Sequence, residues 1–70
     1  MESKFAERLK ELRVNAGLSQ SQLANELGGK INQSTIARWE MKKREPGFDA
    51  VLEIAIYFGV SLDYLGGLED

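Results

Sequence analysis

The sequence contains neither cysteine nor histidine, and these absences exclude several kinds of functional site. Without thiols the chain forms no disulfide and gives no indication of a redox compartment. Without either residue type it has no Cys/His zinc site and no Ser-His-Asp or Cys-His catalytic arrangement. The carboxylates are scattered along the chain with no pattern that raises a pKa. We therefore expect a protein that is not an enzyme and that needs no metal or cofactor.

Long apolar runs are also missing from the sequence. None approaches the roughly 18 residues that a membrane-spanning helix needs. Met1 is followed by Glu2-Ser3-Lys4, which does not resemble a signal peptide. These features predict a cytoplasmic protein with no membrane partner.

The length of 70 residues, with 43% apolar residues, is sufficient for one small core. We expect a single domain over residues 1–70, with an ordered core from about residue 3 to residue 66. Because no disulfide supports it, its stability has to come from packing.

Basic residues are few, and their distribution is uneven although the net charge is only −2. Residues 1–29 carry four basic and four acidic groups, and residues 45–70 carry six acids and no base. Residues 30–44 carry five basic groups and one acid, for a net charge of +4. A localised basic patch is the electrostatic feature that nucleic-acid binding requires. A solvated charged turn is the alternative interpretation.

Two helices are predicted in the first 28 residues. Residues 3–16 place Phe5, Leu9, Leu12 and Ala16 on one stripe, with Ser3 as a possible N-cap and Gly17 at the end. The second helix is predicted over residues 19–28, ending at Gly28. Ser19 and Gln22, three residues apart at its start, have the spacing of a capping box. Leu23 and Leu27 face inward, and Ile31 is expected to be a buried plug before the next helix.

The third predicted helix, from Asn32 to Glu40, has a polar leading edge. Asn32 is a good N-cap, and Ile36 with Trp39 can attach the helix to a core. The base-edge candidates lie on the other face: Gln33, Ser34 and Arg38. Glutamine suits adenine and arginine suits guanine in a major groove. An ordinary amphipathic surface helix is the alternative interpretation.

Residues flanking that face suit the DNA backbone or the helix end. Asn32 and Thr35 are better placed as phosphate-binding or capping groups than as base readers. The cationic residues that follow the helix should lie along the phosphates: Lys42, Lys43 and Arg44.

Two more helices are predicted after Pro46. The fourth begins at Gly47 or Asp49 and ends at Phe58 before Gly59. Its inward face should contain Phe48, Val51, Ala55 and Phe58, with Leu52 and Ile54 flanking it. A short fifth helix, capped by Ser61, contains Leu62 and Leu65. The chain leaves this helix at Gly66-Gly67, and residues 68–70 are expected to be loose.

A helix, a glycine-bearing turn and a polar helix form the pattern of a helix-turn-helix. The segments that carry a wider resemblance follow in order: Leu18-Ser19-Gln20, Leu23-Ala24, Leu27-Gly28, Gln33-Ser34-Thr35-Ile36, Trp39-Glu40, Lys43-Arg44-Glu45-Pro46 and Gly59-Val60-Ser61-Leu62-Asp63-Tyr64-Leu65. Over roughly residues 5–66 the chain resembles the Cro/C1-type (XRE-like) DNA-binding domains of phage and bacterial repressors. The resemblance implies a compact, all-α, five-helix, lambda-repressor-like domain.

The resemblance also assigns roles to individual residues. It implies that Gln20 binds a phosphate and helps to seat the recognition helix. It implies a structural ion pair between Arg13 and Glu40. The chain departs from the family in two places. Gly29-Lys30 lengthens the turn before the third helix, and Lys42 stands where the family commonly has a left-handed glycine.

Apolar residues near the fourth and fifth helices exceed what a monomer needs: Ile56, Tyr57, Val60 and Tyr64. Family members commonly dimerise through this region and bind palindromes. The sequence thus predicts sequence-specific double-stranded DNA binding by a homodimer, as a transcriptional repressor. The alternative is an antitoxin-like or other interaction module that binds a protein partner, such as a toxin or an anti-repressor.

Overall fold

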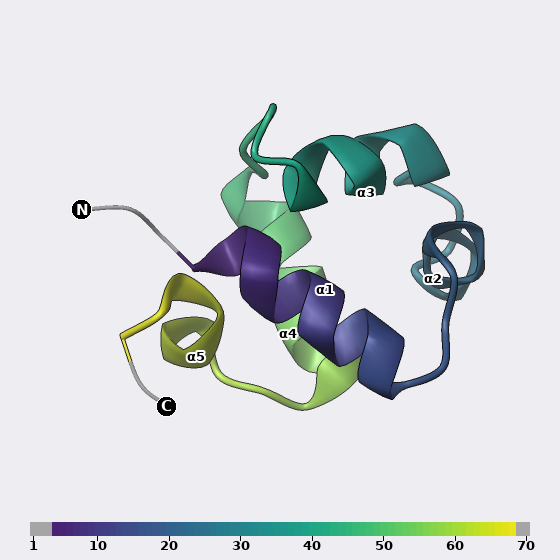
Figure 1. Ribbon diagram of the computed structural model, residues 1–70. Helices are drawn as coiled ribbons and strands as arrows, with labels where there is room; N and C mark the ends of the chain where they lie inside the picture. The colour runs from purple at the N-terminus through teal and green to yellow at the C-terminus, as the bar shows by residue number, and fades with distance from the viewer. Residues whose placement is uncertain (1–3, 69–70) are drawn as a thin grey trace.

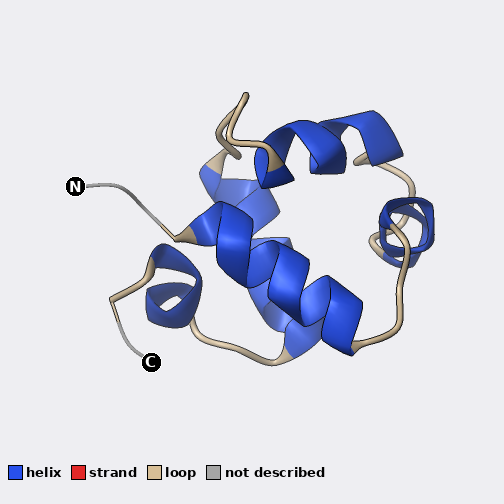
Figure 2. Cartoon of the chain, viewed as in Figure 1, coloured by secondary structure: helices blue, strands red, loops and turns tan. Residues whose placement is uncertain are grey.

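The computed structural model describes residues 4–68, and five α-helices account for most of them (Figure 1). The helices are α1 (Phe5–Asn15), α2 (Gln20–Glu26), α3 (Gln33–Glu40), α4 (Phe48–Phe58) and α5 (Leu62–Gly66). Residues 4–68 contain no strand (Figure 2). The predicted all-α, five-helix fold is therefore confirmed. None of the helices in this stretch is long and apolar enough to cross a membrane.

The starts of the helices follow from capping residues in the sequence. The Ser19 hydroxyl accepts the backbone N–H of Gln22 at 3.0 Å, and the Gln22 side chain accepts the Ser19 N–H at 2.8 Å. This is the predicted capping box, which satisfies two otherwise unpaired donors. At α5 the Ser61 hydroxyl accepts the N–H of Tyr64 at 2.9 Å, a single cap. Ser3 lies outside the described residues, and Lys4 occupies the N-cap position of α1 without a capping hydrogen bond.

The turn between α2 and α3 is built around two adjacent glycines. Gly28 and Gly29 both have positive φ angles, 89° and 79°. Only glycine adopts this region without strain between its Cβ and the backbone, so the pair can reverse the chain directly after α2. Ile31 then packs, half-buried, against the core before α3 begins.

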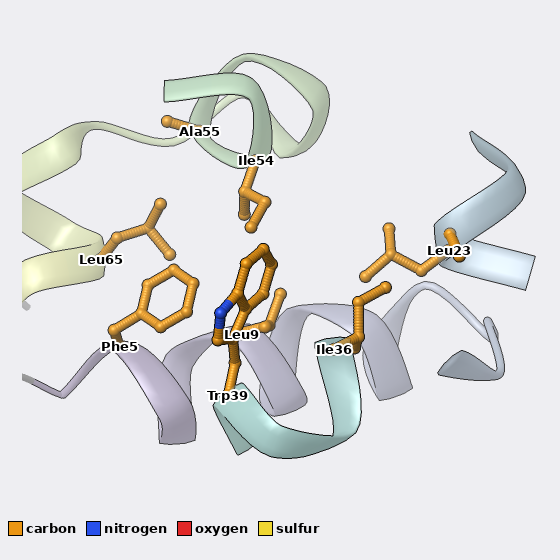
Figure 3. Close-up of a cluster of buried hydrophobic side chains, with 9 residues drawn as sticks. Phe5, Leu9, Leu23, Ile36, Trp39, Ile54, Ala55 and Leu65 are labelled. Carbon is orange, nitrogen blue, oxygen red and sulfur yellow. The ribbon is translucent and has the colours of Figure 1, made fainter. Parts of the chain in front are cut away.

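The core lies where α1, α3, α4 and α5 meet, with α2 packed against α3 (Figure 1). Figure 3 shows the indole of Trp39 at its centre, with Phe5 beside it and Ile54 above it. The Phe5 and Trp39 rings are edge-to-face with centroids 5.9 Å apart, a favourable aromatic geometry. Leu9, Leu23, Ile36, Ile54 and Leu65 are completely buried.

Three residues differ from the sequence prediction. Ala16, predicted in the stripe of the first helix, is exposed because α1 ends at Asn15 and the helical period stops there. Phe48, predicted to face inward, is 68% exposed because it is the first residue of α4 and no neighbouring helix covers it. Ile54, predicted to flank the inward face, is fully buried, so the buried face of α4 is centred nearer to Ile54 and Ala55.

Candidate nucleic-acid interface

The start of α3 is organised by one side-chain oxygen. Oδ1 of Asn32 accepts the backbone N–H of Thr35 and the hydroxyls of Ser34 and Thr35, each at 2.9 Å. Asn32 and Thr35 are thus committed to capping, one of the two roles predicted for them. Ser34 is exposed, but its hydroxyl proton is engaged. Ser34 is therefore left with lone pairs that can accept a hydrogen bond from a ligand.

The two faces of α3 differ as predicted. Ile36 and Trp39 are buried, at 0% and 4% exposure, and attach the helix to the core. Gln33, Ser34 and Arg38 are exposed on the outside of the molecule. In the described part of the chain no hydrogen bond or ion pair involves the Arg38 side chain. Arg38 therefore presents its planar set of donors to solvent, ready for a bidentate acceptor.

The end of α3 is tied to α1 by a part-buried ion pair. Arg13 Nε donates to Glu40 Oε2 at 2.7 Å, and Arg13 Nη2 donates to Glu40 Oε1 at 2.9 Å. The two side chains are only 11% and 5% exposed. The hydrogen bond to Glu40 raises the pKa of Arg13, and Arg13 Nη1 also donates to the Leu18 carbonyl at 2.8 Å. The ion pair that the resemblance implied is therefore present, and it is a scaffold contact.

Two glutamine side chains, Gln20 and Gln33, continue the hydrogen bonds of the Arg13–Glu40 pair to the protein surface. Gln20, in the first turn of α2, donates through Nε2 to Glu40 Oε1 at 3.1 Å. Gln20 Oε1 accepts from Nε2 of Gln33 at 2.7 Å. One residue of α2 therefore contacts both the first residue of α3 and its last. The Gln33 amide retains its oxygen and a second N–H for a ligand, held in one orientation.

The segment after α3 carries the other predicted cations. Lys42 has a φ of 61°, the one positive φ among the described non-glycine residues, so the left-handed conformation predicted for this position is confirmed. Its ammonium lies 2.7 Å from Glu7 Oε1, and this hydrogen bond lowers the pKa of Glu7. Lys43 and Arg44 are exposed, and neither side chain forms a hydrogen bond or ion pair within residues 4–68.

The four residues predicted for self-association differ in their exposure. Ile56 is 73% exposed, and Tyr57 is 38% exposed and donates its hydroxyl to Glu26 at 2.9 Å. Val60 packs half-buried against the core. The guanidinium carbon of Arg8 lies over the Tyr64 ring, 4.2 Å from the ring centroid. Sequence reasoning missed Phe48 and Leu52, which are exposed at four-residue spacing before Ile56. That spacing was the available signal for an uncovered apolar stripe.

Residues 4–68 contain no cluster of acidic side chains suited to holding a metal ion. The polar side chains that the fold does bring together lie on α3 and on the residues that hydrogen-bond to it, Arg13 and Gln20. They are directional hydrogen-bonding groups on an exposed helix, followed by cations. This arrangement suits the recognition of a polyanion with patterned edges.

Comparison with known proteins gives the family of the chain. Residues 9–65 match a family described as helix-turn-helix. The HTH-type transcriptional regulator ImmR of Bacillus subtilis (strain 168) is 34% identical over 66 residues, which cover 94% of this chain and 50% of that protein. The HTH-type transcriptional activator BcrR of Enterococcus faecalis is 34% identical over 61 residues, covering 87% of this chain and 29% of that protein.

A third relative is the SPbeta prophage-derived HTH-type transcriptional regulator YonR of Bacillus subtilis (strain 168). It is 36% identical over 61 residues, covering 87% of this chain and 55% of that protein. The chain thus spans about half or less of the length of these three relatives. The chain has five helices, its α3 is held at both ends by Gln20, and residues 9–65 match the family. It therefore belongs to the Cro/C1-type (XRE-like) helix-turn-helix family.

Proposed function

We propose that this protein binds double-stranded DNA in a sequence-specific manner and regulates transcription. The observation that carries the proposal is the outer face of α3, where Gln33, Ser34 and Arg38 are exposed on a helix held at both ends. A major groove admits one α-helix, and amide and guanidinium groups match its base edges. The names of the relatives, which are transcriptional regulators, support the same conclusion.

Base reading falls to the three exposed side chains of α3. Arg38 donates to O6 and N7 of a guanine, and Gln33 pairs with N6 and N7 of an adenine. Ser34 accepts from an exocyclic amino group, since its own proton is held by Asn32. The hydrogen bond from Gln33 to Gln20 orients the Gln33 amide before DNA arrives, which lowers the entropy lost on binding.

Backbone binding falls to the residues around the ends of α3. Lys42, Lys43 and Arg44 neutralise phosphates, and the remaining N–H of Gln20 donates to a phosphate oxygen. Asn32 can do the same through its amide nitrogen, since only its oxygen is used in capping. These contacts position α3 without reading sequence.

The first test is the salt dependence of binding to random duplex DNA. Log affinity should fall linearly with log salt, by about 0.9 for each phosphate neutralised. Replacing Lys43 or Arg44 by alanine should reduce that slope by about one unit. Absence of binding at low salt would refute the proposal and favour the alternative module that binds a protein partner. Selection from random duplexes then gives the sequence preference.

We further propose that the protein acts as a homodimeric repressor on a palindromic operator. Exposed apolar side chains on α4, with Ile56 at 73% exposure, support self-association. The half-sites should then lie about one helical turn apart, roughly 34 Å. Inserting about half a turn between them should abolish tight binding. If binding is indifferent to the insertion, the domain binds as a monomer.

The Ile56→Asp variant tests the proposed interface separately from DNA reading. It should lower affinity for a two-half-site duplex and leave affinity for a single half-site unchanged. An equal loss on both duplexes would show that Ile56 supports the fold and not an interface. Sedimentation of the free protein gives the oligomeric state directly.

A further inference from the structure

Four side chains form a continuous row of hydrogen bonds from α1 to the outer face of α3. Glu40 Oε1 accepts from Arg13 Nη2 at 2.9 Å and from Gln20 Nε2 at 3.1 Å. Gln20 Oε1 then accepts from Gln33 Nε2 at 2.7 Å. The row therefore connects a part-buried ion pair with a side chain that the proposed function assigns to base reading.

The order of donors and acceptors in this row is determined by the carboxylate. A glutamine amide has a donor end and an acceptor end, so by itself it can bond in either of two orientations. The Glu40 carboxylate, paired with Arg13, can only accept, and it therefore takes the Nε2 end of Gln20. The Oε1 end of Gln20 is then left for Gln33, and it can only take the Nε2 end of that amide. One charge thus selects the orientation of both amides.

The burial of the four side chains suits transmission from the inside outward. The side chains of Arg13 and Glu40 are only 11% and 5% exposed, and Arg13 is also held by the Leu18 carbonyl. Gln20 is half-buried, and Gln33 is exposed. The end of the row that contains the charges is therefore fixed by the fold, whereas the end that faces solvent is an amide that needs a partner to orient it.

We propose that Glu40 is a positioning residue for base recognition and acts through Gln20 on the amide of Gln33. An adenine presents N7 as an acceptor beside its N6 amino group, which is a donor. With Nε2 turned toward Gln20, the Gln33 amide has its donor on the α2 side and its oxygen on the other. Reversing this amide would oppose donor to donor and acceptor to acceptor on the same adenine. The effect on base preference rests on the proposed function, whereas the orientation of the amide does not.

The orientation is tested without DNA through the side-chain amide protons of Gln33. In the wild type one of them donates to Gln20, so its NMR resonance should lie downfield of those of a solvated glutamine. In Glu40→Gln the new amide offers an N–H as well as an oxygen, so Gln20 can reverse and Gln33 can follow. The downfield shift should then be lost. An unchanged Gln33 resonance in Glu40→Gln would overturn the proposal.

Two further variants separate orientation from loss of stability. Glu40→Gln leaves Arg13 without a carboxylate, whereas Arg13→Met/Glu40→Gln strands no charge and serves for the same measurement if the single variant does not fold. Glu26→Gln makes the same chemical change in another carboxylate, which accepts from Tyr57 of α4 at 2.9 Å. It should leave the Gln33 resonance unchanged. Equal losses of the downfield shift in Glu26→Gln and Glu40→Gln would overturn the assignment to Glu40.

The route through Gln20 is tested by Gln20→Met, whose side chain has a similar length and forms neither hydrogen bond. The Gln33 resonance should lose its downfield shift although the Arg13–Glu40 pair is intact. Adding Glu40→Gln to Gln20→Met should then change the Gln33 resonance no further. A downfield shift that persists in Gln20→Met would overturn this route.

The effect on DNA is a separate measurement, made at the base pair where Gln33→Ala loses its preference. A bidentate amide contributes roughly tenfold to discrimination, so Glu40→Gln should lower discrimination at that pair about threefold or more. Affinity for random duplexes should not fall, and Glu26→Gln should discriminate as the wild type does. A uniform loss on all duplexes would show that Glu40 only supports the fold. If the protein binds no DNA at all, the proposed function fails, while the Gln33 resonance still decides whether Glu40 orients the amide.

Discussion

The α2–α3 unit and the α4–α5 unit are held in place by different kinds of contact. In addition to the apolar contacts of Ile36 and Trp39, α3 is connected to its neighbours by directional hydrogen bonds from Gln20 and from the part-buried Arg13. By contrast, α4 and α5 pack through Ile54, Ala55 and Leu65, and no buried polar side chain occurs among the described residues. Directional bonds determine the orientation of a helix, whereas apolar burial mainly determines its proximity.

The charges divide along the same line. Residues 30–44 have a net charge of +4, and residues 45–70 carry six acids without a base. The excess of positive charge therefore lies around α3, mostly in the segment that follows it, where it can attract a polyanion to the exposed face of that helix. The following predictions test this division from the largest expected effect to the smallest.

Removing Arg13 should be the most damaging change to the oriented unit. Arg13→Ala leaves the Glu40 carboxylate, 5% exposed, without its cationic partner, which should cost about 3–5 kcal/mol of unfolding free energy. Urea denaturation measures the loss. Lys10→Ala, which removes an exposed cation from the same helix, should change stability by less than about 0.5 kcal/mol. Strict additivity of Arg13→Ala and Glu40→Ala would contradict the coupling.

Removing Ile54 tests the apolar unit. The side chain is completely buried, so Ile54→Ala should cost about 2–5 kcal/mol through lost burial and a cavity. Ile56→Ala, two residues on but 73% exposed, is the matched control and should cost under about 0.5 kcal/mol in the monomer. Equal losses in thermal unfolding of the two variants would mean that the buried face of α4 is wrongly assigned.

Replacing Arg38 tests the reading face without disturbing its support. Arg38→Ala should cost about 1–3 kcal/mol on the selected sequence and relax preference at one base pair. Lys43→Ala should weaken binding to all sequences alike. Competition binding with single-base variants of the duplex measures both effects. An equal loss on selected and random DNA would remove Arg38 from base reading.

Replacing Lys42 combines two opposing effects. A left-handed lysine is strained by about 1–2 kcal/mol, so its replacement by glycine should stabilise the fold. The greater freedom of glycine in the unfolded chain offsets about 0.4–1 kcal/mol of this gain. Loss of the exposed pair with Glu7 takes back a further small part of the gain. Lys42→Gly should therefore raise the melting temperature more clearly in a Glu7→Gln background than in the wild type. A fall in that background would contradict the strain argument.

The Glu7–Lys42 pair should also leave a small pH dependence. Because Lys42 lowers the pKa of Glu7 below its ordinary 4.5, the pair stabilises the fold above that pH. The contribution is lost as the pH falls through the lowered pKa. Between about pH 7 and about pH 3 the melting temperature should fall further in the wild type than in Glu7→Gln. Identical profiles would show that the pair contributes nothing measurable.

Local features of the structure were determined by residues close together in the sequence. Ser19, Asn32 and Ser61 begin their helices by bonding to a backbone N–H three residues on, and such short contacts form whatever the helices pack against. Comparison with a family also identified the left-handed Lys42 and the distant Arg13–Glu40 pair. The fold and most of the candidate interface were therefore predictable.

Only the tertiary structure decided what depends on how the helices cross. It exposed Phe48 and buried Ile54, because the helical period gives the direction of a side chain but not whether a neighbour covers it. It joined Gln20 of α2 to Gln33 of α3, and Lys42 to Glu7 of α1. It also buried the indole N–H of Trp39, and it left a cavity where residues from four helices meet without filling the space between them.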